Sequence, residues 1–103
     1  FLPPERVNLC CREPLKRFTD NTITDPVRLK EELALIRSRG YAVDDMEHEY
    51  GIKCVGVPIF DKAGQVCAAM SVSGPSLRFG QERILELAQM LKEYAYKIQL
   101  GIY

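Results

Sequence analysis

The fold of this chain is decided by the stretch Ile52-Lys-Cys-Val-Gly-Val-Pro-Ile-Phe60, which continues through Asp61-Lys-Ala-Gly64 into Gln65-Val-Cys-Ala-Ala-Met-Ser-Val-Ser73. The first and third segments are rich in β-forming residues. The four residues between them suit a tight turn, so the sequence predicts a β-hairpin. Pro58 cannot donate a backbone hydrogen bond to a neighbouring strand, so we expect it at a sheet edge or a bulge.

The two faces of this hairpin differ in the size of their side chains. If Phe60 pairs with Gln65 across a four-residue loop, Cys54 lies opposite Ser71 and Gly56 opposite Ala69. That face is small and weakly polar, and its members are Cys54, Gly56, Ala69, Ser71 and Ser73. The opposite face is bulky, with Val55, Val57, Ile59, Val66, Ala68, Met70 and Val72. We expect the bulky face to pack under helices. The small face either meets another element closely or leaves a hollow for a ligand.

The register of the hairpin stays open at this point. A three-residue loop with Gly64 as a bulge would shift the pairing by one residue. Cys54 would then share a face with Met70 and Val72. In the four-residue register, two serines at a spacing of two lie opposite a cysteine and beside a glycine. This arrangement suits either a ligand pocket or hydroxyls with a purely structural role.

Helices are predicted on both sides of the hairpin in the sequence. Asp25-Pro26 suits the N-cap and first position of a helix that ends at Gly40. A short helix follows Pro4, and a short strand over 41–43 precedes the polar segment Asp44–Gly51. A long helix begins near Gln81, and its apolar stripe comprises Ile84, Leu87, Leu91, Tyr94 and Ile98. This order predicts an α+β fold with an antiparallel sheet packed against helices.

The composition limits the class of protein. The chain has 103 residues, 47% of them hydrophobic and 27% charged, as expected for one globular domain or part of one. Fourteen Lys and Arg balance fourteen Asp and Glu, so direct nucleic-acid binding by this stretch is not expected. No apolar run approaches the roughly 18–20 residues that span a bilayer. The opening Phe-Leu-Pro-Pro, without Met or a signal-peptide pattern, indicates an excised piece of a longer protein.

The four cysteines do not have the spacing of a zinc site. Cys10 and Cys11 are adjacent, while Cys54 and Cys67 are isolated in runs that suggest burial. We expect four reduced thiols in a cytosolic protein. A redox switch formed by Cys10 and Cys11 is the alternative.

Catalytic and metal-binding interpretations find little support in the spacing of polar residues. A Cys54–His48–Asp44 triad would make a thiol enzyme, but nothing in the spacing favours it. Asp44, His48 and Glu49 fall in an irregular loop, so a metal site there is equally unsupported. We therefore expect no enzyme activity, no metal and no cofactor.

Several runs together resemble the effector-binding domain of the IclR family of bacterial and archaeal transcription regulators. They are Gly40-Tyr-Ala-Val-Asp-Asp-Met-Glu47, Gly51-Ile-Lys-Cys-Val-Gly-Val-Pro-Ile-Phe-Asp61 and Ala68-Ala-Met-Ser-Val-Ser-Gly-Pro75. Asn21-Thr-Ile-Thr-Asp-Pro26 and the following helix to Ile36-Arg-Ser-Arg-Gly-Tyr41 add to the resemblance. It extends over nearly all of the chain, and the order and spacing of its motifs are specific.

The resemblance implies a GAF-like domain whose curved antiparallel sheet holds a small metabolite on its concave side. Residues 1–103 would be the later part of this effector-binding domain. Its upstream strands and helix would lie outside the chain. So would a winged helix-turn-helix domain, through which the regulator or repressor binds DNA. A cytoplasmic homodimer or homotetramer without membrane contact is implied, and its effector would be a small organic acid or a related metabolite.

The resemblance also implies which residues bind the effector. The acidic residue after the Gly-Tyr strand matches Asp44, the cysteine of the next strand matches Cys54, and the two serines match Ser71 and Ser73. Gly56 and Ala69 would line the same pocket. The resemblance selects the four-residue hairpin register, because these residues must share a face. The alternatives are a ligand-free dimerisation or interaction module and, with less support, a thiol enzyme.

Overall fold

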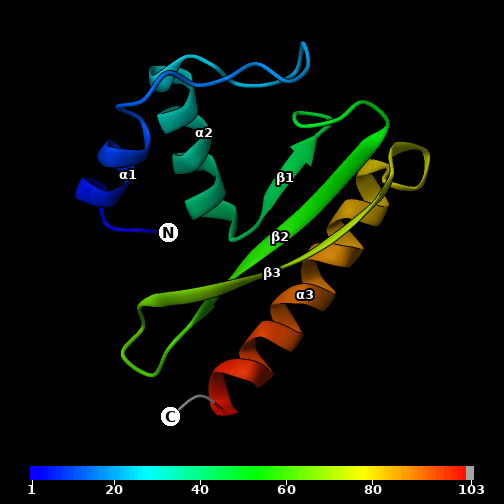
Figure 1. The fold of residues 1–103 in the computed structure, drawn as a ribbon. Coiled ribbons are helices and arrows are strands. Elements are labelled where there is room, and N and C mark those ends of the chain that lie inside the picture. The colour runs from blue at the N-terminus through cyan, green and yellow to red at the C-terminus, as the bar shows by residue number, and fades with distance from the viewer. Residues whose placement is uncertain (102–103) are drawn as a thin grey trace.

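The hairpin forms two strands of a three-stranded antiparallel sheet in the computed structural model, which describes residues 1–101 (Figure 1). The strands are β1 (Ala42–Asp45), β2 (Ile52–Phe60) and β3 (Val66–Pro75), in the spatial order β1-β2-β3. The helices are α1 (Pro4–Cys10), α2 (Pro26–Arg39) and α3 (Gln81–Gly101), and a 3-10 turn (Ser76–Arg78) joins β3 to α3. The predicted α+β fold class is confirmed.

The boundaries of α2 follow from local signals. The Asp25 carboxylate accepts a hydrogen bond from Val27 N–H at 3.0 Å, and Pro26 occupies the first helical position. Gly40 ends the helix in the left-handed conformation (φ 84°). Lys92 of α3 donates to the Arg39 carbonyl at 2.8 Å, so the C-terminal end of α2 is joined to α3.

The tip of the hairpin is a three-residue turn with Gly64 in the left-handed conformation (φ 81°). Gly64 N–H donates to the Asp61 carbonyl at 3.0 Å, and Asp61 N–H donates to the Gln65 carbonyl at 2.8 Å. The expectation of a four-residue loop is therefore wrong. This turn alone would move Cys54 to the bulky face.

A β-bulge beside the turn shifts the pairing by a second residue. Ile59 pairs with Ala68, but Phe60 pairs with Val66, so Cys67 is the extra residue on β3. Beyond the bulge, Val66 has moved to the face of Phe60, contrary to the expectation that it lies on the bulky face. The bulge cannot be read from the sequence, since it depends on how β3 lies against its neighbours.

The two shifts cancel in their effect on the faces, although they change every cross-strand partner. Cys54 pairs with Ser73 instead of Ser71, and Gly56 pairs with Ser71 instead of Ala69. Because the total shift is two residues, the predicted small face is confirmed. Pro58 lies in the central strand, but β1 pairs only with residues 53–56, so β2 is locally an edge at Pro58.

The hydrophobic core lies between the bulky face of β2 and α3. Its buried members are Val55, Val57, Ile59, Phe79, Leu87, Ala88, Leu91 and Ala95. Val55 is fully buried at the centre of this cluster. The apolar stripe predicted for α3 is only partly correct, because Tyr94 and Ile98 are exposed and the two alanines face the core. The short alanine side chains let α3 lie close to the strand.

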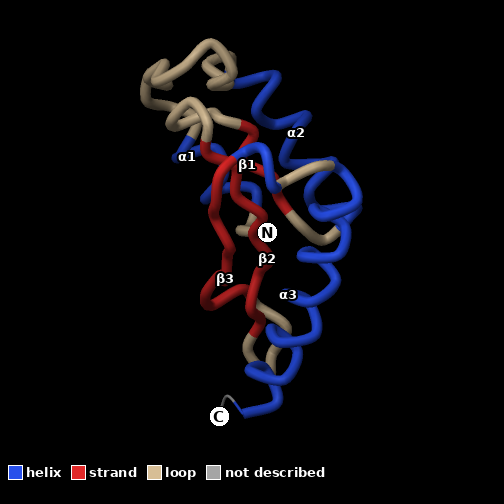
Figure 2. The backbone as a smooth tube through the Cα atoms, turned by 90° about the vertical axis from the view of Figure 1, so that its right-hand side faces the viewer, coloured by secondary structure: helices blue, strands red, loops and turns tan. Residues whose placement is uncertain are grey.

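The opposite face of β2 and β3 is open. In Figure 1, α3 lies behind these strands, whereas α1 and α2 lie beside β1; Figure 2 shows α3 along one side of the sheet. On β3 most side chains are exposed on both faces, including Val72 of the bulky face. The small face is therefore accessible. Within residues 1–101, no helix combines the length and apolar character needed to cross a membrane.

We predict that Gly74→Ala lowers the free energy of unfolding by about 1–3 kcal/mol, because it overpacks the core. A Cβ at Gly74 would lie 2.8 Å from Cε1 of the buried Phe79 ring, which would have to move. Gly56→Ala is the matched control, since its Cβ would meet the Ser71 Cβ at 3.7 Å and the Met70 carbonyl oxygen at 3.8 Å, both ordinary contact distances. Urea unfolding followed by circular dichroism measures both. Equal midpoints for Gly74→Ala and the wild type would contradict this packing.

Candidate functional site

The small face of the sheet brings the sequence-predicted site residues into two neighbouring rows. Asp44, Cys54 and Ser73 are successive cross-strand partners on β1, β2 and β3. The adjacent row consists of Ala42, Gly56 and Ser71. Directly opposite residues have Cβ atoms about 4.5–5.5 Å apart. Asp44, Cys54, Ser71 and Ser73 thus form one continuous patch, which we call the polar patch.

The polar patch has hydrogen-bonding capacity that the described part of the chain does not use. Asp44 and Cys54 are half-buried, while Ser71 and Ser73 are exposed. Asp44 Oδ1 accepts from Glu47 N–H at 2.8 Å. Within residues 1–101, neither the two hydroxyls nor the thiol makes a hydrogen bond, and Asp44 Oδ2 accepts none. These groups are free to bind a solvent molecule or a ligand.

A pocket of about 650 Å³ adjoins the polar patch. Its floor includes Gly56, Ala69 and Ser71, and Leu33 and Ile36 of α2 contribute to its wall. Asp44, Cys54 and Ser73 are not among its lining residues, since they lie one row further along the same face. The polar patch and the pocket together form a surface with an apolar hollow and a hydrophilic end.

Arg6 of α1 reaches this pocket, and sequence reasoning missed it. Among the described residues, it is the one charged side chain in the lining. Its guanidinium makes no ion pair or hydrogen bond within residues 1–101. A guanidinium beside an apolar hollow favours a ligand that carries a carboxylate. No local pattern in the sequence could have placed Arg6 there, because α1 reaches the sheet only through the tertiary fold.

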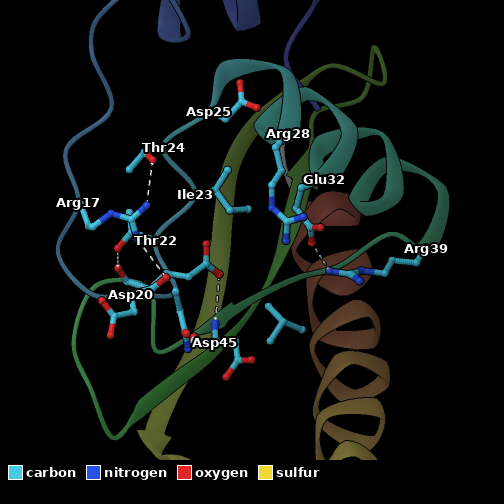
Figure 3. A pocket seen from close by; sticks show the side chains of 13 residues that line it. Arg17, Asp20, Thr22, Ile23, Thr24, Asp25, Arg28, Glu32, Arg39 and Asp45 are labelled. Atoms are coloured by element: carbon cyan, nitrogen blue, oxygen red, sulfur yellow. Dashed lines mark hydrogen bonds and ion pairs between the residues drawn. The ribbon is translucent and has the colours of Figure 1, made fainter.

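A second pocket, of about 660 Å³, lies between the loop 17–25, α2 and β1 (Figure 3). Its lining carries charged groups of both signs, several of which are engaged. Arg39 pairs with Glu32 at 3.5 Å, and Arg17 donates to Thr24 Oγ1 at 3.3 Å (Figure 3). The lining includes no residue of the polar patch. We therefore place the candidate site on the small face of the sheet.

The loop that follows Asp44 is electrostatically crowded. Burial raises the pKa of the Glu47 carboxyl, a hydrogen bond from Asp45 N–H at 3.2 Å opposes this, and the Asp44 carboxylate raises the pKa further. Glu32 and Asp45 act in the same direction as Asp44. Glu47 thus keeps its proton to a higher pH than an ordinary glutamate. Its ionisation, as the pH rises through that pKa, disfavours the folded loop.

The arrangement of His48 does not assemble a thiol triad. Its ring packs against Phe18 with centroids 4.9 Å apart, and no hydrogen bond within residues 1–101 joins it to Cys54. In the same residues, no group of three or more His, Cys, Asp or Glu side chains is placed to hold a metal ion.

All four cysteines are free. Cys10 is exposed and Cys11 is buried. Cys67 is exposed at the bulge, contrary to the expectation of burial, as are its neighbours Ala68 and Ala69 on β3. Its thiol donates to the Ile59 carbonyl at 3.5 Å.

Comparison with known proteins identifies the family. The model of the family described as "Bacterial transcriptional regulator IclR C-terminal" matches residues 1–100. The regulator BhcR of Paracoccus denitrificans is 46% identical over 88 residues, which are 85% of this chain and 32% of BhcR. The crystal structure of Thermotoga maritima IclR superposes with a TM-score of 0.94 at 47% identity, over 99% of this chain and 42% of that one.

A second similar structure holds a small molecule. It is a double mutant of the PobR inducer-binding domain from Acinetobacter, in complex with 3-hydroxybenzoic acid. It has a TM-score of 0.86 and 26% identity, over 95% of this chain and 57% of that one.

The chain spans about a third of the length of the curated relatives it matches. These relatives are named transcriptional regulators and repressors rather than enzymes. The family match covers almost every residue of the chain. The chain therefore belongs to the IclR family of transcriptional regulators, and its residues 1–100 match the C-terminal domain of these regulators.

Proposed function

We propose that this domain binds a small organic acid on the small face of its sheet, and that binding changes how the whole regulator holds DNA. The observation that carries the proposal is the polar patch, whose free hydroxyl and carboxylate groups adjoin an apolar pocket. The PobR inducer-binding domain, which has the same fold, holds an aromatic hydroxy acid. The size of the pocket, about 650 Å³, is in the range of small-molecule sites.

Each residue of the site has a distinct role in this proposal. The hydroxyls of Ser71 and Ser73 donate to oxygen atoms of the effector, and Asp44 accepts from an effector hydroxyl or orders a water molecule. Cys54 packs against the effector beside Asp44. Gly56 and Ala69 leave room for its body, because neither has a large side chain. Each neutral hydrogen bond contributes about 0.5–1.5 kcal/mol, so several with enclosure reach micromolar affinity, about −8 kcal/mol.

Regulation requires parts of the protein beyond this chain. We propose that an N-terminal domain binds the operator DNA, which agrees with the zero net charge of residues 1–103. A cytoplasmic homodimer or homotetramer would couple paired C-terminal domains to paired DNA-binding domains. The effector shifts the equilibrium only if it binds one conformation of the oligomer more tightly than the other.

We predict that the double variant Ser71→Ala/Ser73→Ala binds the effector about 5- to 150-fold more weakly, since it loses two hydrogen bonds worth about 1–3 kcal/mol in total. The measurement is isothermal titration calorimetry of the full-length regulator with keto acids, sugar acids and aromatic acids. Ser38→Ala is the control, because its hydroxyl donates to the Leu35 carbonyl on the exposed side of α2. Wild-type affinity in the double variant would refute this site. Absence of binding to any acid would favour a ligand-free interaction module.

We predict that Gly56→Val weakens effector binding at least about tenfold while the unfolding midpoint stays at or above that of the wild type. A Cβ at this position has ordinary contact distances, and a β-branched residue suits a strand, but its methyl groups would occupy the pocket floor. Gly56→Ala should give a smaller loss of affinity. Full binding by Gly56→Val would show that the effector does not lie over this glycine.

A further inference from the structure

Three consecutive backbone carbonyls, at the last residue of β1 and in the loop that follows it, are each bound by a side chain from the turn Thr19–Thr22. Asn21 Nδ2 donates to the Asp45 carbonyl at 2.8 Å. Thr19 Oγ1 donates to the Met46 carbonyl at 2.6 Å, and Thr22 Oγ1 donates to the Glu47 carbonyl. We call this set of three contacts the carbonyl clamp. It joins segments about 25 residues apart in the sequence.

The donors of the carbonyl clamp are themselves held in place. Thr22 Oγ1 accepts from Phe18 N–H at 3.1 Å and from Thr19 N–H at 3.0 Å. Thr19 Oγ1 accepts from Asn21 N–H at 3.0 Å, and Thr19 is only 4% exposed. Arg17 supports the same turn through the Asp20 carbonyl at 3.1 Å, as its position in Figure 3 shows. Each hydroxyl therefore has both a donor and an acceptor partner, which fixes its direction.

The loop that the clamp holds does not have a relaxed backbone. Met46 has φ 55°, in the left-handed region that residues with a side chain rarely adopt. Such a conformation persists only where surrounding contacts impose it. The clamp provides these contacts, because the carbonyls it binds belong to Met46 and to the residues on either side.

The loop in turn orients the carboxylate of the polar patch. Glu47 N–H donates to Asp44 Oδ1 at 2.8 Å, so the side chain of Asp44 is fixed by the position of the Glu47 amide. The clamp contact from Thr22 is on the carbonyl of that same residue. Asp44 Oδ2 is left without a partner within residues 1–101, next to Cys54 on the open face.

We propose that Thr19, Asn21 and Thr22 are positioning residues of the effector site. They do not touch the effector; they hold the loop so that Asp44 presents its free oxygen over the small face. This inference rests on the proposed function, since it gives the clamp a role in effector affinity beyond its role in the fold. Loss of a clamp contact would let Met46 leave the left-handed conformation and release Asp44.

The first test needs no effector. In the full-length regulator, Thr22→Val should increase the hydrogen-exchange rate of the Glu47 amide at least about tenfold, and Thr22→Ser should restore the wild-type rate. Exchange of the Val55 amide in the core should not change. Thr24→Val is the matched control, because Thr24 Oγ1 is bonded to Arg17 and not to the loop after β1. If Thr22→Val also speeds the exchange of Val55, this variant has disturbed the core. Asn21→Ala then takes its place, because it removes one clamp contact at an exposed position. Wild-type exchange at Glu47 in both variants would overturn the proposal.

The second test measures affinity by calorimetry, with 3-hydroxybenzoate as the first acid titrated and the acids of the serine experiment as the others. Thr22→Val should weaken binding about tenfold, and Thr22→Ser should bind within about twofold of the wild type. In an Asp44→Ala background, Thr22→Val should have no further effect, because it acts through Asp44. If the serine double variant binds the effector more weakly but Thr22→Val binds it as the wild type does, the positioning role of the clamp is overturned and the proposed function is not. Absence of binding to all acids, or indifference to the serines, would overturn the proposed function.

Discussion

The site depends on the total shift of the hairpin pairing being an even number of residues. A strand shows alternate side chains to opposite faces, so a shift by one residue exchanges the faces. The turn at Gly64 introduces one such shift and the bulge at Cys67 introduces another. With only one of them, Met70 and Val72 would lie beside Cys54. With both, the serines lie beside Cys54, and the bulky residues of β2 face α3.

The one-sided core follows from this arrangement. Because Val55, Val57 and Ile59 bury themselves against α3, the sheet does not need a second apolar layer over β2. The alanines of α3 bring the helix close to the strand without filling the space with large side chains. The other face can therefore carry small and polar residues, which contribute little to packing and leave hydrogen-bonding groups unused. The core thus occupies one face of β2, and the proposed ligand site occupies the other.

The sequence predicts what is locally encoded and misses what depends on distant contacts. The ends of α2 are set by Asp25, Pro26 and Gly40 within a few residues, and these were predictable. The bulge was not, and a periodic stripe of large residues could not show that Ala88 and Ala95 face the core. Arg6 and the carbonyl clamp belong to segments far in sequence from the sheet. The one available signal was the density of Thr, Asn and Asp side chains over 19–25, which suits hydrogen bonding to backbone groups.

The contacts around α2 connect the candidate site to the core. The turn that clamps the loop after β1 lies a few residues before α2, and Ile23 and Thr24 connect it to the Asp25 cap. At the other end, the Arg39 carbonyl accepts from Lys92 of α3, whose buried side covers β2. The loop beside Asp44 is therefore connected through the clamp turn to the N-terminal end of α2. The C-terminal end of α2 is hydrogen-bonded to α3. In the proposed function, a ligand on Asp44 acts on the Glu47 amide and, through the Glu47 carbonyl, on the clamp turn that precedes α2. This chain of contacts gives an effector bound on the sheet a route to the surface of the domain.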